Sequence, residues 1–146
     1  MSRVFVSDTT GAAIYVFTDD HCPPHVHVRH RGEGWIMRVT FSYVGSEVDL
    51  ISISPLKSVP LQRVVNGLLH EIRTRLADCR RMWWTMRQTT WLENQWAVAR
   101  VDGRLEPGAN DTPEARQIAN ATYDPTTEWL HVIFRDGTTT EVRVHS

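Results

Sequence analysis

Short apolar runs alternate with turn residues through the first part of the chain, a pattern typical of β-strands. Residues 7–11 have the composition of a turn, so the two runs that flank them are predicted to form a hairpin. Pro23 and Pro24 block a helix and favour an extended entry into the next strand. The pattern predicts a mostly antiparallel sheet of about five short strands, at residues 4–6, 12–17, 25–29, 35–43 and 47–53.

From Ser58 onward the apolar positions recur every three or four residues, which predicts one long helix. Ser58 is the expected N-cap, and Pro60 is tolerated in the first turn, where its missing N–H has no intrahelical partner. The helix is expected to end at Met86 or Arg87. Residues 91–98 are predicted to form a further short helix or strand.

The C-terminal part again has the pattern of strands and turns. Residues 102–112 are rich in glycine and acidic residues, and they are interpreted as a surface linker. Asp124-Pro125 and Asp136-Gly137 are strong turn signals. They separate three strand-like runs, at residues 117–123, 129–134 and 138–145, which predict a three-stranded meander.

Together these patterns predict an α+β fold. A mostly antiparallel N-terminal sheet packs on a long helix and is followed by a three-stranded C-terminal β-meander. The predicted division is a sheet-plus-helix domain at residues 1–101, a linker at 102–116 and a meander lobe at 117–146.

Composition narrows the class of protein. The chain has 146 residues, the size of one ordinary domain, and its two cysteines, Cys22 and Cys79, form no C-x-x-C motif. The N-terminus lacks the apolar core of a signal peptide, so we expect a cytoplasmic protein with no membrane association. The net charge is −1, but residues 57–101 carry eight basic against three acidic side chains. The cationic character is therefore concentrated in the middle of the chain.

The densest chemistry lies in one segment, Asp20-His21-Cys22-Pro23-Pro24-His25-Val26-His27. Alternate side chains of a strand share a face, so His25 and His27 are expected to project together, about 6–7 Å apart along the chain. Two imidazoles on one face are half of a metal site, and the candidate metal is a divalent transition ion such as zinc. Further candidate donors close in sequence are Asp20, His21, Cys22 and His30.

Two other interpretations stay open at this point. His25 and His27 can act without metal as an acid–base pair, because histidine titrates near neutral pH. Either chemistry suits hydrolysis or phosphodiester cleavage. Alternatively, the histidines hold the Pro-Pro turn through their own hydrogen bonds or recognise a partner.

The segment D-H-C-P-P-H-V-H at residues 20–27 resembles the signature D-H-x-P-P-H-x-H of a small bacterial domain-of-unknown-function family, family 4160. The resemblance covers roughly residues 3–96. The sequence departs from the family pattern at Cys22, where members commonly carry a proline or a small residue.

The tail at residues 119–144 resembles a second family, domain-of-unknown-function family 2442. The matching residues are Ala121-Thr122-Tyr123-Asp124 and the later run ending in Asp136-Gly137. Together the two resemblances imply a natural fusion of two small domains whose genes often lie side by side in bacteria as suspected toxin–antitoxin partners. They imply no established catalytic residue.

The middle of the chain combines arginine with tryptophan. Such residues can hold phosphates and stack on unpaired bases, so this region is a candidate nucleic-acid or partner surface. The residues proposed for it are Arg73, Arg80, Arg81, Arg87 and Trp84. The alternative is that Trp83 fills the core and that the arginines pair with the acidic C-terminal part.

Two functions are therefore predicted. The first is a regulatory or interaction protein of toxin–antitoxin type that binds a protein partner or a second copy of itself. The second is a small hydrolase or nuclease that uses His25 and His27, assisted by His21 or Cys22, with or without metal.

Overall fold

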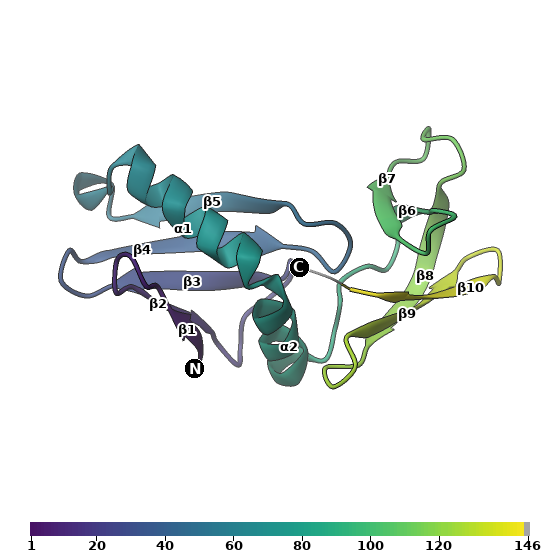
Figure 1. Ribbon diagram of the computed structural model, residues 1–146, viewed down its shortest axis with the longest axis horizontal. Coiled ribbons are helices and arrows are strands. Elements are labelled where there is room, and N and C mark those ends of the chain that lie inside the picture. The colour runs from purple at the N-terminus through teal and green to yellow at the C-terminus, as the bar shows by residue number, and fades with distance from the viewer. Residues whose placement is uncertain (145–146) are drawn as a thin grey trace.

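The computed structural model describes residues 1–144 and contains two five-stranded antiparallel sheets (Figure 1). The first sheet follows chain order, and every neighbouring pair of strands is antiparallel. Its strands are β1 (Ser2–Val6), β2 (Ala13–Val16), β3 (His25–His30), β4 (Trp35–Phe41) and β5 (Val48–Ser54). The predicted N-terminal strands are thus present.

The two sheets are connected through a short 3-10 helix, η1 (Leu56–Ser58), and two α-helices, α1 (Gln62–Thr74) and α2 (Leu76–Arg87). The second sheet has the order β10-β9-β8-β6-β7. Its strands are β6 (Trp96–Ala99), β7 (Leu105–Gly108), β8 (Arg116–Tyr123), β9 (Trp129–Phe134) and β10 (Thr139–Arg143).

Helix α1 lies across one face of the first sheet in Figure 1. Val26 and Val28 point to this face, because they pair in register with Val39 and Met37 and all four are fully buried. On the opposite face, which α1 does not cover and which we call the open face, a cross-strand row runs through the sheet from β1 to β4. Its members are Arg3, Tyr15, His27 and Arg38.

The predicted long helix is wrong, because the chain breaks at Arg75 (φ −117°, ψ 26°) into helices of 13 and 12 residues. The Thr74 hydroxyl donates to the Glu71 carbonyl oxygen, and the Arg75 N–H is shared between the carbonyls of Glu71 and Ile72. These local bonds tighten the last turn. The apolar stripe passes through the break because Ile72 and Leu76 keep helical spacing, so periodicity does not detect it.

The start of the helix also differs from the prediction. Ser58 ends the 3-10 helix, and α1 begins at Gln62 with Leu61 at its N-cap and no side-chain cap.

The predicted α+β fold with a three-stranded meander is wrong as well, because the structure is mostly β and the C-terminal sheet has five strands. Residues 96–99, assigned to the first domain, form β6 and pair with β8. The segment interpreted as linker contains β7, which pairs with β6 across a tight turn at Gly103 (φ 85°). The glycine-rich, acidic composition marks a hairpin turn here. Part of the last predicted strand, His145, lies outside the described residues.

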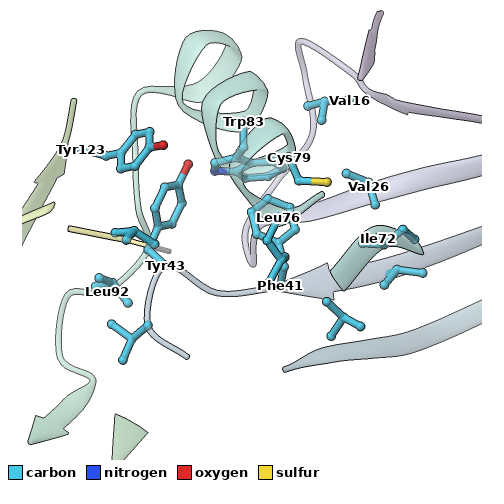
Figure 2. Packing of buried hydrophobic residues seen from close by; sticks show 14 of the residues in the cluster. Val16, Val26, Phe41, Tyr43, Ile72, Leu76, Cys79, Trp83, Leu92 and Tyr123 are labelled. Atoms are coloured by element: carbon cyan, nitrogen blue, oxygen red, sulfur yellow. The ribbon is translucent and has the colours of Figure 1, made fainter. Parts of the chain in front are cut away.

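The second sheet packs against α2 and the end of the first sheet. Figure 2 shows Tyr43 and Tyr123 close together beside α2, and their ring centroids are 5.0 Å apart. Trp83, Cys79 and Leu76 project from α2 into the same buried cluster. The core is therefore continuous between the two sheets.

None of the helices among residues 1–144 has the length and apolar character needed to span a membrane.

Candidate metal centre

Asp20 is held in place by the loop between β2 and β3. Its Oδ2 accepts a hydrogen bond of 2.8 Å from the Phe17 N–H, and its own N–H reaches the Phe17 carbonyl oxygen at 3.4 Å. This turn folds the loop back over the open face of the sheet. Because Oδ2 accepts the backbone hydrogen bond, Oδ1 is the carboxylate oxygen that faces the histidines.

His25 and His27 lie on one face of β3, with ring centroids 5.0 Å apart. Both rings turn Nε2 toward Asp20: the Oδ1 atom is 3.5 Å from Nε2 of His25 and 3.1 Å from Nε2 of His27. All three side chains are buried, with 6–8% of each residue exposed. The donor atoms of the group lie within 4.8 Å of one another.

The tautomer of His25 follows from its other nitrogen. Nδ1 lies 2.9 Å from the carbonyl oxygen of Pro23, and because a carbonyl only accepts, Nδ1 carries the hydrogen. In the neutral ring Nε2 is then a bare lone pair facing the Asp20 carboxylate. Two acceptors in a buried site repel, and a proton or a metal cation between them removes the repulsion. A ligating histidine whose second nitrogen donates to a backbone carbonyl is the usual metal-site arrangement.

Aromatic packing fixes His27. Tyr15 stacks on its ring at 5.6 Å with an interplanar angle of 13°, and Phe17 meets it edge-on at 4.8 Å. Burial lowers the pKa of His27 below its usual value, against the opposing effect of the Asp20 hydrogen bond. The neutral form is the one that binds a metal.

The distance of Asp20 from each histidine is compatible with a small divalent cation, and all three donor atoms lie within 4.8 Å of one another. With metal–ligand distances near 2.0–2.2 Å, neighbouring donors in a tetrahedral or octahedral site lie roughly 2.9–3.5 Å apart. The two Asp20–histidine distances, 3.1 and 3.5 Å, fall in this range. Asp20, His25 and His27 therefore form a buried group that can hold a metal ion.

A pocket of about 140 Å³ opens beside His25. The predicted ligands His21 and Cys22 line it, and they do not belong to the three-residue donor group. The ring centroid of His21 is 6.2 Å from that of His25. Burial raises the pKa of the Cys22 thiol, although Arg87 lowers it. Arg38 and Thr40 complete the polar side of the pocket.

The remaining candidate donor, His30, serves the fold. Its Nε2 bonds the Thr10 carbonyl oxygen at 3.0 Å, and its Nδ1 accepts the Glu33 N–H at 2.9 Å. The ring also stacks on Trp35.

Three of the four arginines proposed for a nucleic-acid surface make contacts within the protein. Arg80 is 1% exposed, and Nε and Nη2 donate to the carbonyls of Ser42 and Gly45. Further intramolecular partners hold the others: Arg81 pairs with Asp78 and Glu128, Arg87 donates to the Thr18 carbonyl oxygen, and Trp84 packs against Tyr123. Arg73 is exposed on α1.

Sequence reasoning named Asp20 as one of several possible donors and left it out of the preferred ligand set. The carboxylate reaches the histidines only because the loop turns back at Phe17, and strand spacing does not reveal that turn. The available signal was an acid five residues before the first histidine of an H-x-H pair.

No family model, curated protein or solved structure matches this chain.

Proposed function

We propose that the chain is a metal-dependent hydrolase whose metal, zinc or a similar divalent transition ion, is bound by Asp20, His25 and His27. The observation that supports the proposal is the convergence of three buried donors on one point next to an open pocket. Structural zinc sites use four protein ligands, whereas catalytic sites use three and leave a position for water or substrate. A group of three donors beside a pocket fits the catalytic type.

The protein's own side chains have separate tasks in this proposal. A bound divalent ion supplies Lewis acidity and activates water. Pro23 and Phe17 hold the ligands in orientation through the hydrogen bonds to His25 and Asp20. His21, exposed at the pocket, is placed to give a proton to a leaving group, and Arg38 to attract an anionic substrate.

The proposal is tested with an activated phosphodiester, bis(p-nitrophenyl) phosphate, on tag-free protein. Activity should disappear with a chelator, return with added zinc or manganese, and fall at least about 100-fold in His25→Ala. His131→Ala is the matched control, because His131 is a partly exposed histidine of β9 paired with Glu141. Equal activity in His25→Ala and the control, or activity unaffected by chelation, would argue against the metal-dependent mechanism.

A regulatory role of toxin–antitoxin type is a second candidate, and the packing of the second sheet on α2 favours it. Arg81 reaches the Pro125 carbonyl oxygen and the Glu128 carboxylate, while Trp84 contacts Tyr123. A C-terminal sheet that packs on α2 in this way is compatible with a fused toxin and antitoxin. We therefore expect Arg81→Glu with Tyr123→Ala to slow cell growth on expression relative to wild type. A folded variant with wild-type growth would count against this role.

A further inference from the structure

A pocket of about 600 Å³ lies on the open face of the first sheet, at β1, β2 and β3, and no function has yet been assigned to it. Its floor contains two small residues, Gly11 and Ala13, and cationic side chains stand around it. We call it the arginine pocket, after Arg3, Arg29 and Arg31.

The sheet register explains why the hollow exists. Arg3 pairs with Tyr15 across β1 and β2, and Arg29 pairs with Ala13 across β2 and β3. The two arginines therefore rise from the same face on either side of β2. Between them the methyl group of Ala13 leaves space that a longer side chain would fill.

The three arginines have no fixed negative partner. Among residues 1–144, none of them has an ion pair or a side-chain hydrogen bond, and no acidic residue lines the pocket. All three are exposed. By contrast, Arg75, Arg81, Arg100, Arg104 and Arg116 each pair with a carboxylate. Three unpaired guanidinium groups around one hollow favour an anion, and their planar forks match phosphate oxygens.

We propose that the arginine pocket binds the phosphate group of a phosphoester ligand. The pocket is large enough for more than the phosphate, because small-molecule sites commonly measure about 300–1,000 Å³. Tyr15 and Met1 supply apolar surface for the rest of the ligand. A nucleotide or one unit of a nucleic-acid strand has this composition.

The pocket adjoins the candidate metal centre. Tyr15 lines the pocket, and its ring stacks on His27. A phosphoester held by Arg3 and Arg29 is thus anchored on the same face as the metal ligands. If the proposed function holds, which is a separate claim, the phosphoester is the substrate. The binding itself does not depend on it.

The test measures binding of two fluorescent probes at low salt, a mononucleotide and a single-stranded oligonucleotide. We expect saturable binding that weakens with salt, and a dissociation constant raised at least about tenfold in Arg3→Gln with Arg29→Gln. The matched control is Arg63→Gln with Arg143→Gln, two exposed arginines of α1 and β10 that do not line the pocket, and it should stay within about twofold of wild type.

The two probes identify the source of the phosphate. Binding of the mononucleotide would identify the ligand as a small phosphoester, and binding of the oligonucleotide alone would identify it as a nucleic-acid strand. Either result supports phosphate binding in the arginine pocket. Absence of binding by either probe, or an equal loss in the control, overturns it. Both substituted arginines are exposed, so the substitutions should leave the fold intact, and circular dichroism checks this.

An Asp20→Asn variant distinguishes failure of the phosphate-binding proposal from failure of the proposed metal site. Asp20→Asn removes a proposed metal ligand and leaves the arginine pocket unchanged. It should bind the probes like wild type, even though it hydrolyses nothing. Probe binding lost in Asp20→Asn but retained in the arginine variant would place the anion site at the metal centre instead.

Discussion

Nδ1 of His25 lies 2.9 Å from the carbonyl oxygen of Pro23, and this contact decides which ring nitrogen faces Asp20. Because the carbonyl requires a donor, the neutral ring must carry its hydrogen on Nδ1. Long-range proton–nitrogen NMR spectra of the metal-free protein at pH 8 should therefore show His25 protonated at Nδ1 and bare at Nε2. Addition of zinc should shift the Nε2 resonance. A spectrum with the hydrogen on Nε2 would refute the assignment and remove His25 as an Nε2 ligand.

Glu71 couples α1 to the β1–β2 turn. Its carboxylate accepts hydrogen bonds from the hydroxyls of Ser7 and Thr9 and from the Asp8 N–H. Burial raises the pKa of Glu71, but these bonds outweigh it and the net pKa is lower than usual. At pH 7, Glu71→Gln should lower the free energy of unfolding by about 1–2 kcal/mol. The value is kept this small because the Glu71 carboxylate is partly exposed and solvent screens its interactions.

The pH dependence of this difference has a definite sign. A carboxyl group whose pKa is lower in the folded than in the unfolded protein stabilises the fold at pH values above its unfolded-state pKa, here near 4.5. That stabilisation is lost as the pH falls through the folded-state pKa. Urea unfolding of wild type and Glu71→Gln should therefore differ at pH 7 and converge at low pH. A difference independent of pH would show that the carboxylate charge is irrelevant.

Arg80 and Arg81 are neighbours in sequence with opposite environments. Arg80 is buried and satisfies the Ser42 and Gly45 carbonyls, while Arg81 pairs with partly exposed acids at the surface. Arg80→Met should lower the unfolding free energy by about 2–4 kcal/mol, because the buried guanidinium and its hydrogen bonds to two part-buried carbonyls are lost. Arg81→Met should cost less than about 1 kcal/mol. Chemical denaturation compares them, and equal losses would contradict the buried role of Arg80.

The two cysteines should react at different rates. Burial raises the pKa of Cys79 to about 12, and the side chain is fully inaccessible. Cys22 is partly exposed beside the 140 Å³ pocket. Iodoacetamide at pH 8 followed by peptide mass spectrometry should modify Cys22 in the native protein and Cys79 only after unfolding, because the thiolate is the reactive form. Native labelling of Cys79 would mean that the core around α2 opens readily.

The strands of the first sheet were predictable because their signals are local. Alternation and the turn residues locate the β1–β2 hairpin, and the Pro23-Pro24 pair marks the entry to β3. The joint orientation of His25 and His27 follows from strand geometry alone, so it too was accessible from the sequence.

The features that were missed depend on contacts distant in sequence or on backbone turns. Asp20 joins the histidines through a turn at Phe17, and β6 finds β8 across about twenty residues, at Trp96 and Gln117. Neither partner is visible in local periodicity. Likewise, the break at Arg75 preserves the apolar stripe, so periodicity does not reveal it. Arg80 has the composition of a surface charge, but it is buried and donates a hydrogen bond to the Ser42 carbonyl oxygen.

The most direct measurement of the central claim is zinc binding to the tag-free, chelator-treated protein by calorimetry, with Asp20→Asn and His131→Ala as variants. We predict about one zinc ion per chain for wild type and for His131→Ala, with a dissociation constant at or below about 1 μM, and at least a hundredfold weaker binding for Asp20→Asn. Wild-type protein that binds no zinc at millimolar concentration, or Asp20→Asn that binds as tightly as wild type, would contradict the account.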